Sequence, residues 1–482
     1  MAWPGRDRTA LGFLALISIG VLLLVGVLLA VLLTRGGHEH AAPTTTTTTE
    51  TTTTAPPPPP PATTTAPPPP PTTTAPPPPP PGPLQAVSVG PLSAVVEWTR
   101  AKPPAAVAYG LPDLGPTMWA PVEGRRATLT GLRYSTLYRV WAGDATLDVQ
   151  TTGPPSSPTA AIGNGTILLD GQGFFPLLVV NQCESGYENS LAAGISLFAG
   201  SDCGDIAEQS AALGGRAFSL TNPDEHGIGG DGVIGWYYPD EADAKGLTGA
   251  TLPAFPTLAQ TGRLRVLTLS NHVYSRTAAL PAGRGVYPGL IAKSDVVGFD
   301  LYPLQEFCRA DWLPDVAAAQ HELVRLARGR PTFQWIEAQS WRCRQPKLMV
   351  TPETLRAESW LSVVGGARGI GFFPADWDFV VTPAIAAIAK EVAAIGSGLL
   401  GPDVAASASG PVLAAARSSN GALYVFAVNP TRTAARATVT VPGLAGRVGM
   451  VLEEGRNVTA SGDSFSDDFG PLAVHLYVFP PS

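Results

Sequence analysis

Eight short runs of apolar and β-branched residues recur between residues 167 and 400, separated by segments with helical periodicity. Strands that alternate with helices along a chain pair in parallel, and eight of them can close a barrel. No Gly-x-Gly-x-x-Gly motif follows a strand-like run, which disfavours an open dinucleotide-binding sheet. The pattern predicts a (β/α)8 barrel (a TIM barrel) over residues 165–400, with strands at 175–181, 194–200, 216–221, 232–238, 265–271, 295–301, 332–337 and 369–374.

The clearest helical segment spans residues 313–328. Apolar residues from Val316 to Leu326 recur there at helical spacing, and Gly329 provides a C-terminal stop. Thr351 and Pro352 predict an N-cap and a first-turn proline for a further helix. Both segments have the place in the chain that a barrel requires of its helices.

The segments on both sides of the predicted barrel have a different period. Residues 84–153 alternate short strand-like runs with Gly/Pro turns, which predicts a small β-sandwich. The same alternation without helices returns in residues 401–482 and predicts a second β-sandwich. Residues 127–141 resemble the corner between strands E and F of fibronectin type III domains, with Tyr138 as the corner tyrosine. This resemblance implies a spacer or binding module.

The amino-terminal region predicts a membrane anchor. Residues 11–33 form a nearly unbroken apolar run without a charge, long enough to cross a hydrocarbon core of roughly 30 Å. Arg6 and Arg8 outweigh Arg35, which favours a cytoplasmic tail at residues 1–10 and an exported body. No small-residue cleavage site follows Leu33 directly, so a retained signal anchor in the cell membrane is favoured; secretion after signal cleavage stays open.

Residues 34–83 predict a disordered linker. Threonine runs alternate there with proline blocks, and such a segment can neither form a helix nor bury a core. Polyproline II rises about 3.1 Å per residue, so this linker can hold the body on the order of 100 Å from the membrane.

Composition and missing motifs limit the function classes. The net charge is −7 and the body has no Lys/Arg cluster, so no nucleic-acid partner is indicated and a neutral substrate fits better. No Gly-x-Ser-x-Gly elbow, His-Glu-x-x-His motif or phosphate loop is present, which disfavours esterases, zinc proteases and nucleotide-dependent enzymes. No cofactor is expected, and the oligomeric state is expected to be monomeric.

Four cysteines, Cys183, Cys203, Cys308 and Cys343, lie in the part expected to be exported, where disulfides persist. Three connectivities are possible from the sequence alone. The predicted strands put Cys183 and Cys203 on neighbouring loops and Cys308 and Cys343 on another neighbouring pair, so these pairings are favoured. Four free thiols remain the alternative.

Two glutamates each end an aromatic, β-branched run. Glu241 closes the segment Gly-Trp-Tyr-Tyr-Pro-Asp-Glu, and Glu337 closes Phe-Gln-Trp-Ile-Glu. Burying a carboxylate is costly, and two of them at strand ends flanked by aromatic residues are what glycosidic bond cleavage requires. The pair predicts a glycoside hydrolase.

The order of these residues along the barrel resembles the clan of retaining (β/α)8 glycoside hydrolases. In that clan the acid/base follows strand 4 and the nucleophile ends strand 7, so the resemblance implies that Glu241 is the general acid/base and Glu337 the nucleophile. Asp240 stands where the clan usually has asparagine; it can bind a sugar hydroxyl or compete for the acid role. A carboxyl separation of about 5 to 5.5 Å, which gives retention, is expected.

Further polar and aromatic residues fall at the same level of the barrel. Asp300 and Tyr302 end strand 6, and Tyr302 resembles the tyrosine that hydrogen-bonds the nucleophile in the clan. Asn271 and His272 end strand 5. These residues, and four aromatic residues near the strand ends, are candidate substrate contacts, although a packed loop residue is an equal alternative for each. The aromatic candidates are Trp236, Tyr238, Trp341 and Trp377.

The polar segment 222–226, Asn-Pro-Asp-Glu-His, follows strand 3. It is a candidate substrate loop, lid or metal site, but it has no recognised ligand spacing, and no metal is predicted.

The leading interpretation is a membrane-tethered hydrolase of an extracellular or cell-wall polysaccharide. The rivals are a barrel that binds sugars without turnover, and an adhesion protein that acts through its sandwiches. A decayed site is expected to lose one glutamate, and both are present.

Overall fold

The computed structural model describes residues 82–222, 230–373, 377 and 380–482. The predicted anchor at residues 11–33 and nearly all of the predicted linker lie outside these residues. Within the described part of the chain, no helix is long and apolar enough to cross a membrane.

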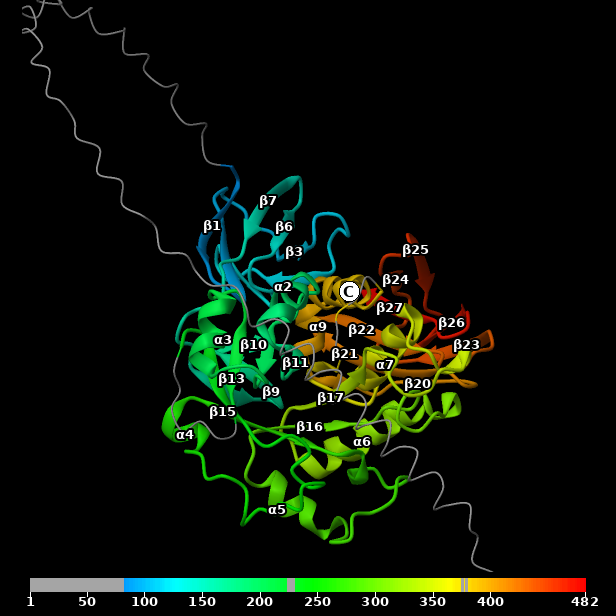
Figure 1. Cartoon of the computed structure of the whole chain (residues 1–482). Helices are drawn as coiled ribbons and strands as arrows, with labels where there is room; N and C mark the ends of the chain where they lie inside the picture. Colours follow the sequence, from blue (N-terminus) through cyan, green and yellow to red (C-terminus); the bar gives the residue numbers. More distant parts are fainter. Residues whose placement is uncertain (1–81, 223–229, 374–376, 378–379) are drawn as a thin grey trace, which may run out of the picture. The chain divides into compact units, whose positions relative to one another are not determined.

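The centre of the fold is a closed barrel of eight parallel strands in chain order, which confirms the predicted architecture (Figure 1). Each strand pairs with the next, and the last pairs with the first. The strands are β11 Leu177–Val180, β12 Leu197–Ala199, β13 Phe218–Thr221, β14 Val233–Tyr237, β15 Leu264–Leu269, β16 Val296–Asp300, β17 Thr332–Glu337 and β18 Ile370–Phe373.

Helices cover the outside of the barrel. The predicted helix at 313–328 is α6, and Thr351 caps α7 by accepting a hydrogen bond from the Thr354 amide. The β14–β15 and β15–β16 connections differ from prediction, because glycines and prolines interrupt them and leave helices of only four and five residues. The helices are α2 Glu184–Ala192, α3 Ile206–Leu213, α4 Leu258–Thr261, α5 Tyr287–Ile291, α6 Asp315–Ala327, α7 Pro352–Val364 and α8 Val381–Ala394, with 3-10 turns η1 Asn271–Val273, η2 Arg284–Val286, η3 Ala310–Trp312 and η4 Pro346–Leu348.

A small antiparallel sheet that the sequence pattern did not predict precedes the barrel. Its strands are β8 Ala160–Gly163, β9 Thr166–Leu169 and β10 Gln172–Phe174. Ile167, Leu169 and Phe174 are buried in the same apolar cluster as Leu178, Phe218 and other inward-facing strand residues.

Two antiparallel sheets form the amino-terminal module, in the orders β1-β2-β5 and β4-β3-β6-β7. The Tyr138 hydroxyl accepts a hydrogen bond of 2.9 Å from the Arg133 amide, the geometry expected of a corner tyrosine. Strand β4 was not predicted. The strands are β1 Leu84–Val89, β2 Ser93–Trp98, β3 Ala106–Gly110, β4 Met118–Pro121, β5 Arg126–Thr130, β6 Leu137–Ala142 and β7 Ala145–Gln150.

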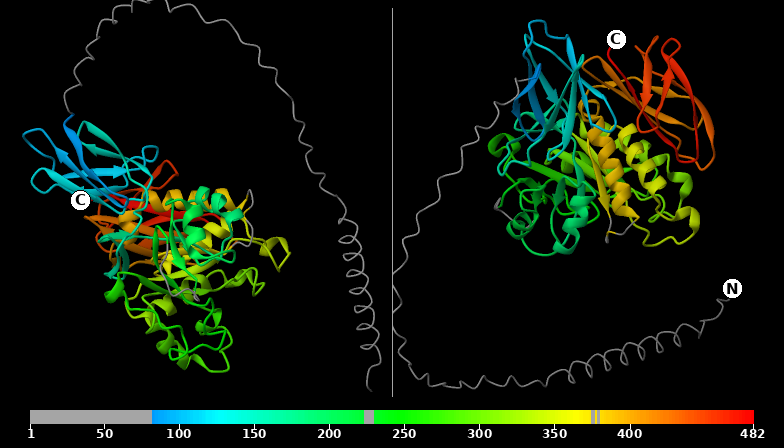
Figure 2. Two further views of the ribbon diagram at one scale, coloured as in Figure 1. Left: turned by 60° about the vertical axis from the view of Figure 1, so that its left-hand side comes forward. Right: turned by 90° about the horizontal axis from the view of Figure 1, so that it is seen from above.

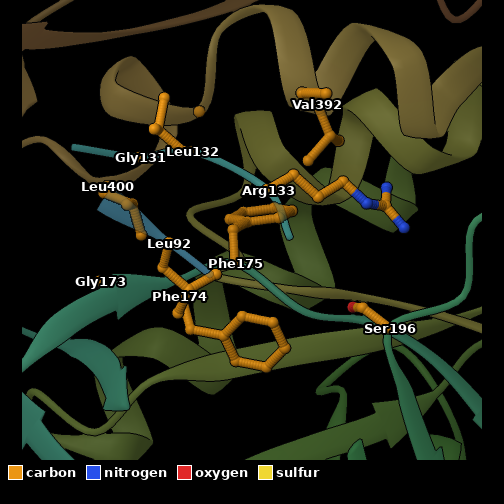
Figure 3. A pocket seen from close by; sticks show the side chains of 12 residues that line it. Leu92, Gly131, Leu132, Arg133, Gly173, Phe174, Phe175, Ser196, Val392 and Leu400 are labelled. Atoms are coloured by element: carbon orange, nitrogen blue, oxygen red, sulfur yellow. The ribbon is translucent and has the colours of Figure 1, made fainter. Parts of the chain in front are cut away.

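The amino-terminal module is docked onto the barrel through Arg133 and Tyr134. The Arg133 guanidinium donates to the carbonyl oxygens of Gly194 and Ala389, and the Tyr134 hydroxyl donates to the Ser196 carbonyl over 3.3 Å. A cavity of about 30 Å³ remains beside these contacts (Figure 3). It is far too small for a sugar ring, so it is a packing defect at the junction.

The carboxy-terminal module is a second antiparallel sandwich, as predicted, and α9 Gly396–Leu400 leads into it. Its sheets have the orders β19-β21-β22-β27-β24-β25 and β20-β23-β26. The strands are β19 Asp403–Val404, β20 Ser407–Ala408, β21 Leu413–Ser419, β22 Ala422–Val428, β23 Ala435–Thr440, β24 Val448–Val451, β25 Arg456–Thr459, β26 Ser464–Phe469 and β27 Val474–Phe479.

Helix α7 lies between the barrel and this second sandwich (Figure 2). Trp360 stacks on Phe426 of β22 with ring centroids 5.6 Å apart. Arg356 donates to the Val474 carbonyl over 2.9 Å and to Glu391 of α8 over 2.7 Å. One face of α7 therefore packs on the barrel strand β17 and another on the sandwich.

Candidate active site

Four acidic residues gather at the carboxyl end of the barrel, which we call the mouth. Asp240 and Glu241 follow β14, Asp300 ends β16, and Glu306 lies in the loop after β16. Burial raises the pKa of Asp300 well above its usual value, and the charges of Asp240, Glu241 and Glu306 raise it further. These four residues form what we call the acidic cluster.

Asp240 ends a chain of hydrogen bonds that starts in the barrel interior. The Tyr237 hydroxyl donates to Asp240 Oδ1 over 2.7 Å and lies 2.8 Å from Thr268 Oγ1. Trp335 Nε1 donates to that same Oγ1 over 2.9 Å. Because an indole N–H can only donate, the chain runs from Trp335 through Thr268 and Tyr237 to Asp240. A carboxylate that accepts from the end of such a chain is held in place.

Asp300 is the most buried member of the acidic cluster, with 8% of its surface exposed. The Tyr302 hydroxyl donates to Asp300 Oδ2 over 2.6 Å. Oδ1 is buried and has no hydrogen-bond partner among the described residues. A buried oxygen without a partner is costly, so Oδ1 would gain from a hydrogen bond with a ligand. Like Glu337, Asp300 is not among the residues that line the two pockets described below.

Glu241 is half-buried and has a left-handed backbone, with φ at 46°. This region is uncommon for residues other than glycine. Burial raises the pKa of Glu241, and the charges of Asp240, Glu306 and Asp243 add to the shift while Lys245 opposes it. The raised pKa agrees with the acid role that the sequence suggested.

Glu337, the expected partner of Glu241, is affected by one member of the acidic cluster, because the charge of Glu306 helps to raise its pKa. It is 0% exposed, and its two oxygens accept hydrogen bonds of 2.7 Å from the backbone amides of Leu304 and Gln305. Its carboxyl neighbour is Glu358 of α7. The loop after β16 folds over this strand end, so Glu337 lines neither of the pockets described below.

Trp236 and Tyr238 point to the outer face of β14, away from the mouth. Trp236 stacks on Phe255 at 5.4 Å, and the Tyr238 hydroxyl donates to the Lys293 carbonyl over 3.0 Å. Because side chains alternate along a strand, Tyr237 between them faces the interior. These two expected substrate contacts are therefore packing residues, and Tyr237, which was not a candidate, reaches Asp240.

Asn271 and His272 follow β15 as predicted, but both have partners in the protein. Asn271 Nδ2 donates to Glu306 Oε1 over 2.8 Å, and His272 Nδ1 lies 2.7 Å from the Ala278 carbonyl oxygen. Burial raises the pKa of Glu306, while His272, Arg342 and Asn271 oppose that shift. Asn271 thus orients a member of the acidic cluster.

Aromatic residues line one side of the mouth. Tyr302 stacks on Phe373 at 5.7 Å, and Trp341 meets Tyr302 edge-on at 5.4 Å. Trp377 lies elsewhere at the mouth, where its Nε1 donates to Gln182 Oε1 over 2.8 Å. Trp377 is therefore placed beside a polar group, whereas Trp341 packs edge-on against the aromatic rings of Tyr302 and Phe373.

Two adjoining pockets open at the mouth. One of about 560 Å³ is lined by polar residues that include Asp240, Tyr237 and Lys245. The other, of about 500 Å³, is lined by Gln182, Trp377 and neighbours. Asn181 and Asp202 line both pockets, and each volume lies in the usual range for small-ligand sites.

Two disulfides join the loops around the mouth and confirm the favoured pairing. Cys183 and Cys203 link the loops after β11 and β12, and Cys308 and Cys343 link those after β16 and β17. Their Cα atoms lie 5.1 and 5.7 Å apart, within the ordinary range for a disulfide.

The expected polar loop 222–226 is described only at Asn222, whose Oδ1 accepts from the Ser201 amide over 2.6 Å; residues 223–226 lie outside the described residues. Within the described ranges, no group of three or more His, Cys, Asp or Glu residues is arranged to hold a metal ion.

Sequence reasoning missed Tyr237, Thr268, Gln182 and Glu306. Tyr237 had a signal, since strand alternation puts it on the opposite face from Trp236 and Tyr238. The other residues carry no local pattern that marks them.

No family model matches the chain, and no curated protein matches it. Among solved structures, α-galactosidase I from Mortierella vinacea matches at 13% identity and a TM-score of 0.41, over 64% of this chain and 97% of that one. A GH30 endoxylanase from Clostridium papyrosolvens C71 matches at 11% identity and a TM-score of 0.35, over 67% and 100%. The maltogenic α-amylase AmyB from Thermotoga neapolitana matches at 9% identity and a TM-score of 0.37, over 64% and 99%. The chain thus resembles structures of glycoside hydrolases in fold only, at values too low to transfer chemistry.

Proposed function

We propose that the protein is a glycoside hydrolase whose two working carboxyl groups are Asp240 and Asp300. The observation that carries the proposal is the difference between the surroundings of Asp240 and those of Asp300. Asp240 accepts a hydrogen bond from Tyr237 and lines a pocket, whereas burial and the Asp240 charge raise the pKa of Asp300. A protonated carboxyl group beside an ionised one is the requirement for glycosidic cleavage, and the raised pKa of Asp300 favours the protonated form of that residue.

Asp300 supplies the proton. Its Oδ1 has no partner among the described residues, so a protonated Oδ1 can donate to the glycosidic oxygen while Oδ2 accepts from Tyr302. The bond between the anomeric carbon and that oxygen breaks, and the leaving sugar departs with the proton. Burial and the charge of Asp240 raise the pKa of Asp300 and so favour its protonated form.

Asp240 supplies the negative charge. Its carboxylate attacks the anomeric carbon and forms a glycosyl ester as the leaving group departs. Asp300, now ionised, removes a proton from water, and the water oxygen displaces Asp240 from the sugar. This double displacement retains the configuration at the anomeric carbon, in keeping with the expectation from the sequence.

The pockets support a carbohydrate chain as substrate. The pocket at Asp240 adjoins the pocket at Trp377 along Asn181 and Asp202, so a chain with one sugar at Asp240 has room for another beside the indole ring. Amide, carboxylate and aromatic groups in these walls suit sugar hydroxyls and the apolar faces of sugar rings. We further propose that the anchor at residues 11–33 holds the enzyme on the outer side of the membrane, where its substrate is an extracellular or cell-wall polysaccharide.

The test is hydrolysis by the full-length protein in detergent, against a panel of α- and β-linked glycans. Wild type should cleave one linkage class, and ¹H NMR should show a first product that keeps the anomeric configuration. Asp240→Asn should lose about 10⁴-fold in kcat, and Asp300→Asn about 10²- to 10⁴-fold. The exposed Glu123→Gln in the amino-terminal sandwich is the matched control.

Two results would redirect the proposal. If Asp300→Asn kept full activity and Glu241→Gln lost it, Glu241 would be the proton donor. Binding without hydrolysis of every glycan would favour a sugar-binding protein.

A further inference from the structure

Glu337 and Glu358 form a buried pair of carboxyl groups outside the acidic cluster. Glu337 is the last residue of β17, Glu358 lies in the middle of α7, and they are 0% and 1% exposed. Burial and the neighbouring Glu337 charge raise the pKa of Glu358, and neither Glu358 oxygen has a hydrogen-bond partner among the described residues. Two buried carboxylates in contact cannot both be ionised, so the pair holds a shared proton.

The hydrogen bonds of Glu337 indicate where this proton lies. Both Glu337 oxygens accept from backbone amides, those of Leu304 and Gln305, each over 2.7 Å. Two amide donors stabilise an ionised acceptor. We therefore assign the proton of the pair to Glu358.

Glu337 fixes the loop that carries Tyr302. Leu304 and Gln305 follow Tyr302 directly in the chain after Pro303. The same loop is held a second time by the Gln305 side chain, whose Nε2 donates to the Leu348 carbonyl over 2.7 Å and whose Oε1 accepts from the Arg342 amide over 2.8 Å.

We propose that Glu337 is a positioning residue: together with Glu358 it holds the loop after β16 so that the Tyr302 hydroxyl stays on Asp300. The kinetic consequences rest on the proposed function, whereas the order of the loop does not. Glu306 is the other charged group that acts on Glu337, and it adds negative charge. On α7 the nearby Arg356 is bound to Glu391 of α8. When the shared proton is lost, the carboxylates of Glu337 and Glu358 repel each other and Glu306 in the loop after β16.

The first test is hydrogen–deuterium exchange of the full-length protein. In Glu337→Gln the side-chain NH2 faces an amide donor, so one hydrogen bond is lost. Exchange in residues 301–309 should rise about tenfold. Glu358→Gln should stay near wild type, because a neutral amide replaces the protonated carboxyl. Glu353→Gln, an exposed residue of the same helix, is the control.

Unchanged exchange of residues 301–309 in Glu337→Gln would overturn the proposal, as would a rise in Glu358→Gln equal to that in Glu337→Gln. Should Glu337→Gln fail to fold, wild type alone decides. Its protection factors in residues 301–309 should fall as the pH rises from about 4.5 to about 8, more than those of β22 in the carboxy-terminal sandwich. An equal change of the protection factors in residues 301–309 and in β22 would contradict the shared proton.

The second test separates positioning from nucleophilic catalysis, on any glycan that wild type hydrolyses. Glu337→Gln should move the alkaline limb of the kcat/KM profile, because the hydrogen bond from Tyr302 to Asp300 is lost. The single variant Glu358→Gln should keep the wild-type limb. Azide should not rescue Glu337→Ala. Rescue by azide would identify Glu337 as the nucleophile, and an unmoved pH profile with lowered stability would leave only a structural role; both overturn the proposal. Absence of hydrolysis by wild type defeats the proposed function, while the exchange test stands.

Discussion

The Tyr237 hydroxyl donates to Asp240 over 2.7 Å, and both residues belong to the same segment at the end of β14. Tyr237 is buried with 1% of its surface exposed. The residue that donates to Asp240 therefore belongs to the strand that Asp240 follows. The Tyr237 hydroxyl is oriented in turn by Thr268 Oγ1.

Tyr237→Phe should lower kcat by about 10- to 100-fold, since Asp240 loses a donor worth about 1.5–3 kcal/mol to a charged group. KM should change little, because the pocket wall keeps its shape. Steady-state kinetics on the identified glycan check this. Tyr187→Phe, a buried tyrosine of α2 that packs on Phe198, should leave kcat unchanged.

Glu241→Gln should move the alkaline limb of kcat/KM to lower pH. The Glu241 charge helps to raise the pKa of Asp300, so its removal lowers that pKa and Asp300 loses its proton sooner as the pH rises. The measurement is a pH–rate profile of the variant beside wild type. A limb that stays in place would mean that Asp300 is not the titrating acid.

Tyr302→Phe should move the same limb in the opposite direction. The Tyr302 hydrogen bond favours ionised Asp300, so its loss raises the pKa of Asp300 further and extends activity to higher pH. The aromatic stack with Phe373 survives in the variant, which makes it a conservative change. Shifts of equal sign in Tyr302→Phe and Glu241→Gln would contradict the assignment.

Glu358→Gln should flatten the fall of thermal stability with rising pH. Burial raises the pKa of Glu337 to about 8 from an ordinary value of 4.5, and that of Glu358 well above its usual value, so the proton that titrates here belongs to the pair. The unfolded chain therefore loses this proton at lower pH than the folded chain, so the stabilisation is complete below pH 4.5 and is lost as the pH rises to about 8. The neutral amide that this substitution introduces favours ionised Glu337 and lowers its pKa. Calorimetry at several pH values measures the slope.

Trp377→Ala should raise KM for oligosaccharides by about tenfold, the loss of one stacked ring contact, and leave kcat for a short aryl glycoside unchanged. The indole is held by Gln182 at one wall of the second pocket. Trp119→Ala in the amino-terminal sandwich is the control. Equal effects on long and short substrates would remove the second sugar site.

The barrel could be predicted because its signal is local. Each of its eight strands carries an apolar run long enough to see, and helices α6 and α7 have clear caps or stops. Strand alternation puts Tyr237 on the opposite face from Trp236 and Tyr238, but which of the two faces is the barrel interior could not be predicted. Barrel strands are buried on both faces, so all three residues look alike in the sequence.

The environment of Glu337 depends on distant contacts. The sequence places it correctly at the end of β17, but the amides of Leu304 and Gln305 that cover it come from a loop about thirty residues earlier, and Glu358 from the next helix. No pattern around Glu337 records these partners. The disulfide pairing could be predicted, because strand order alone brings the paired loops together.

The stacking of Trp360 on Phe426, with Arg356 bound to the Val474 carbonyl, makes α7 common to the barrel and the second sandwich. A fragment cut at residue 401 would leave an apolar helix face in water, so the two modules should melt together in a single calorimetric transition. The boundary that the sequence indicates near residue 401 therefore does not separate two independently folding units, and a shortened version of the protein has to keep its carboxy-terminal strands.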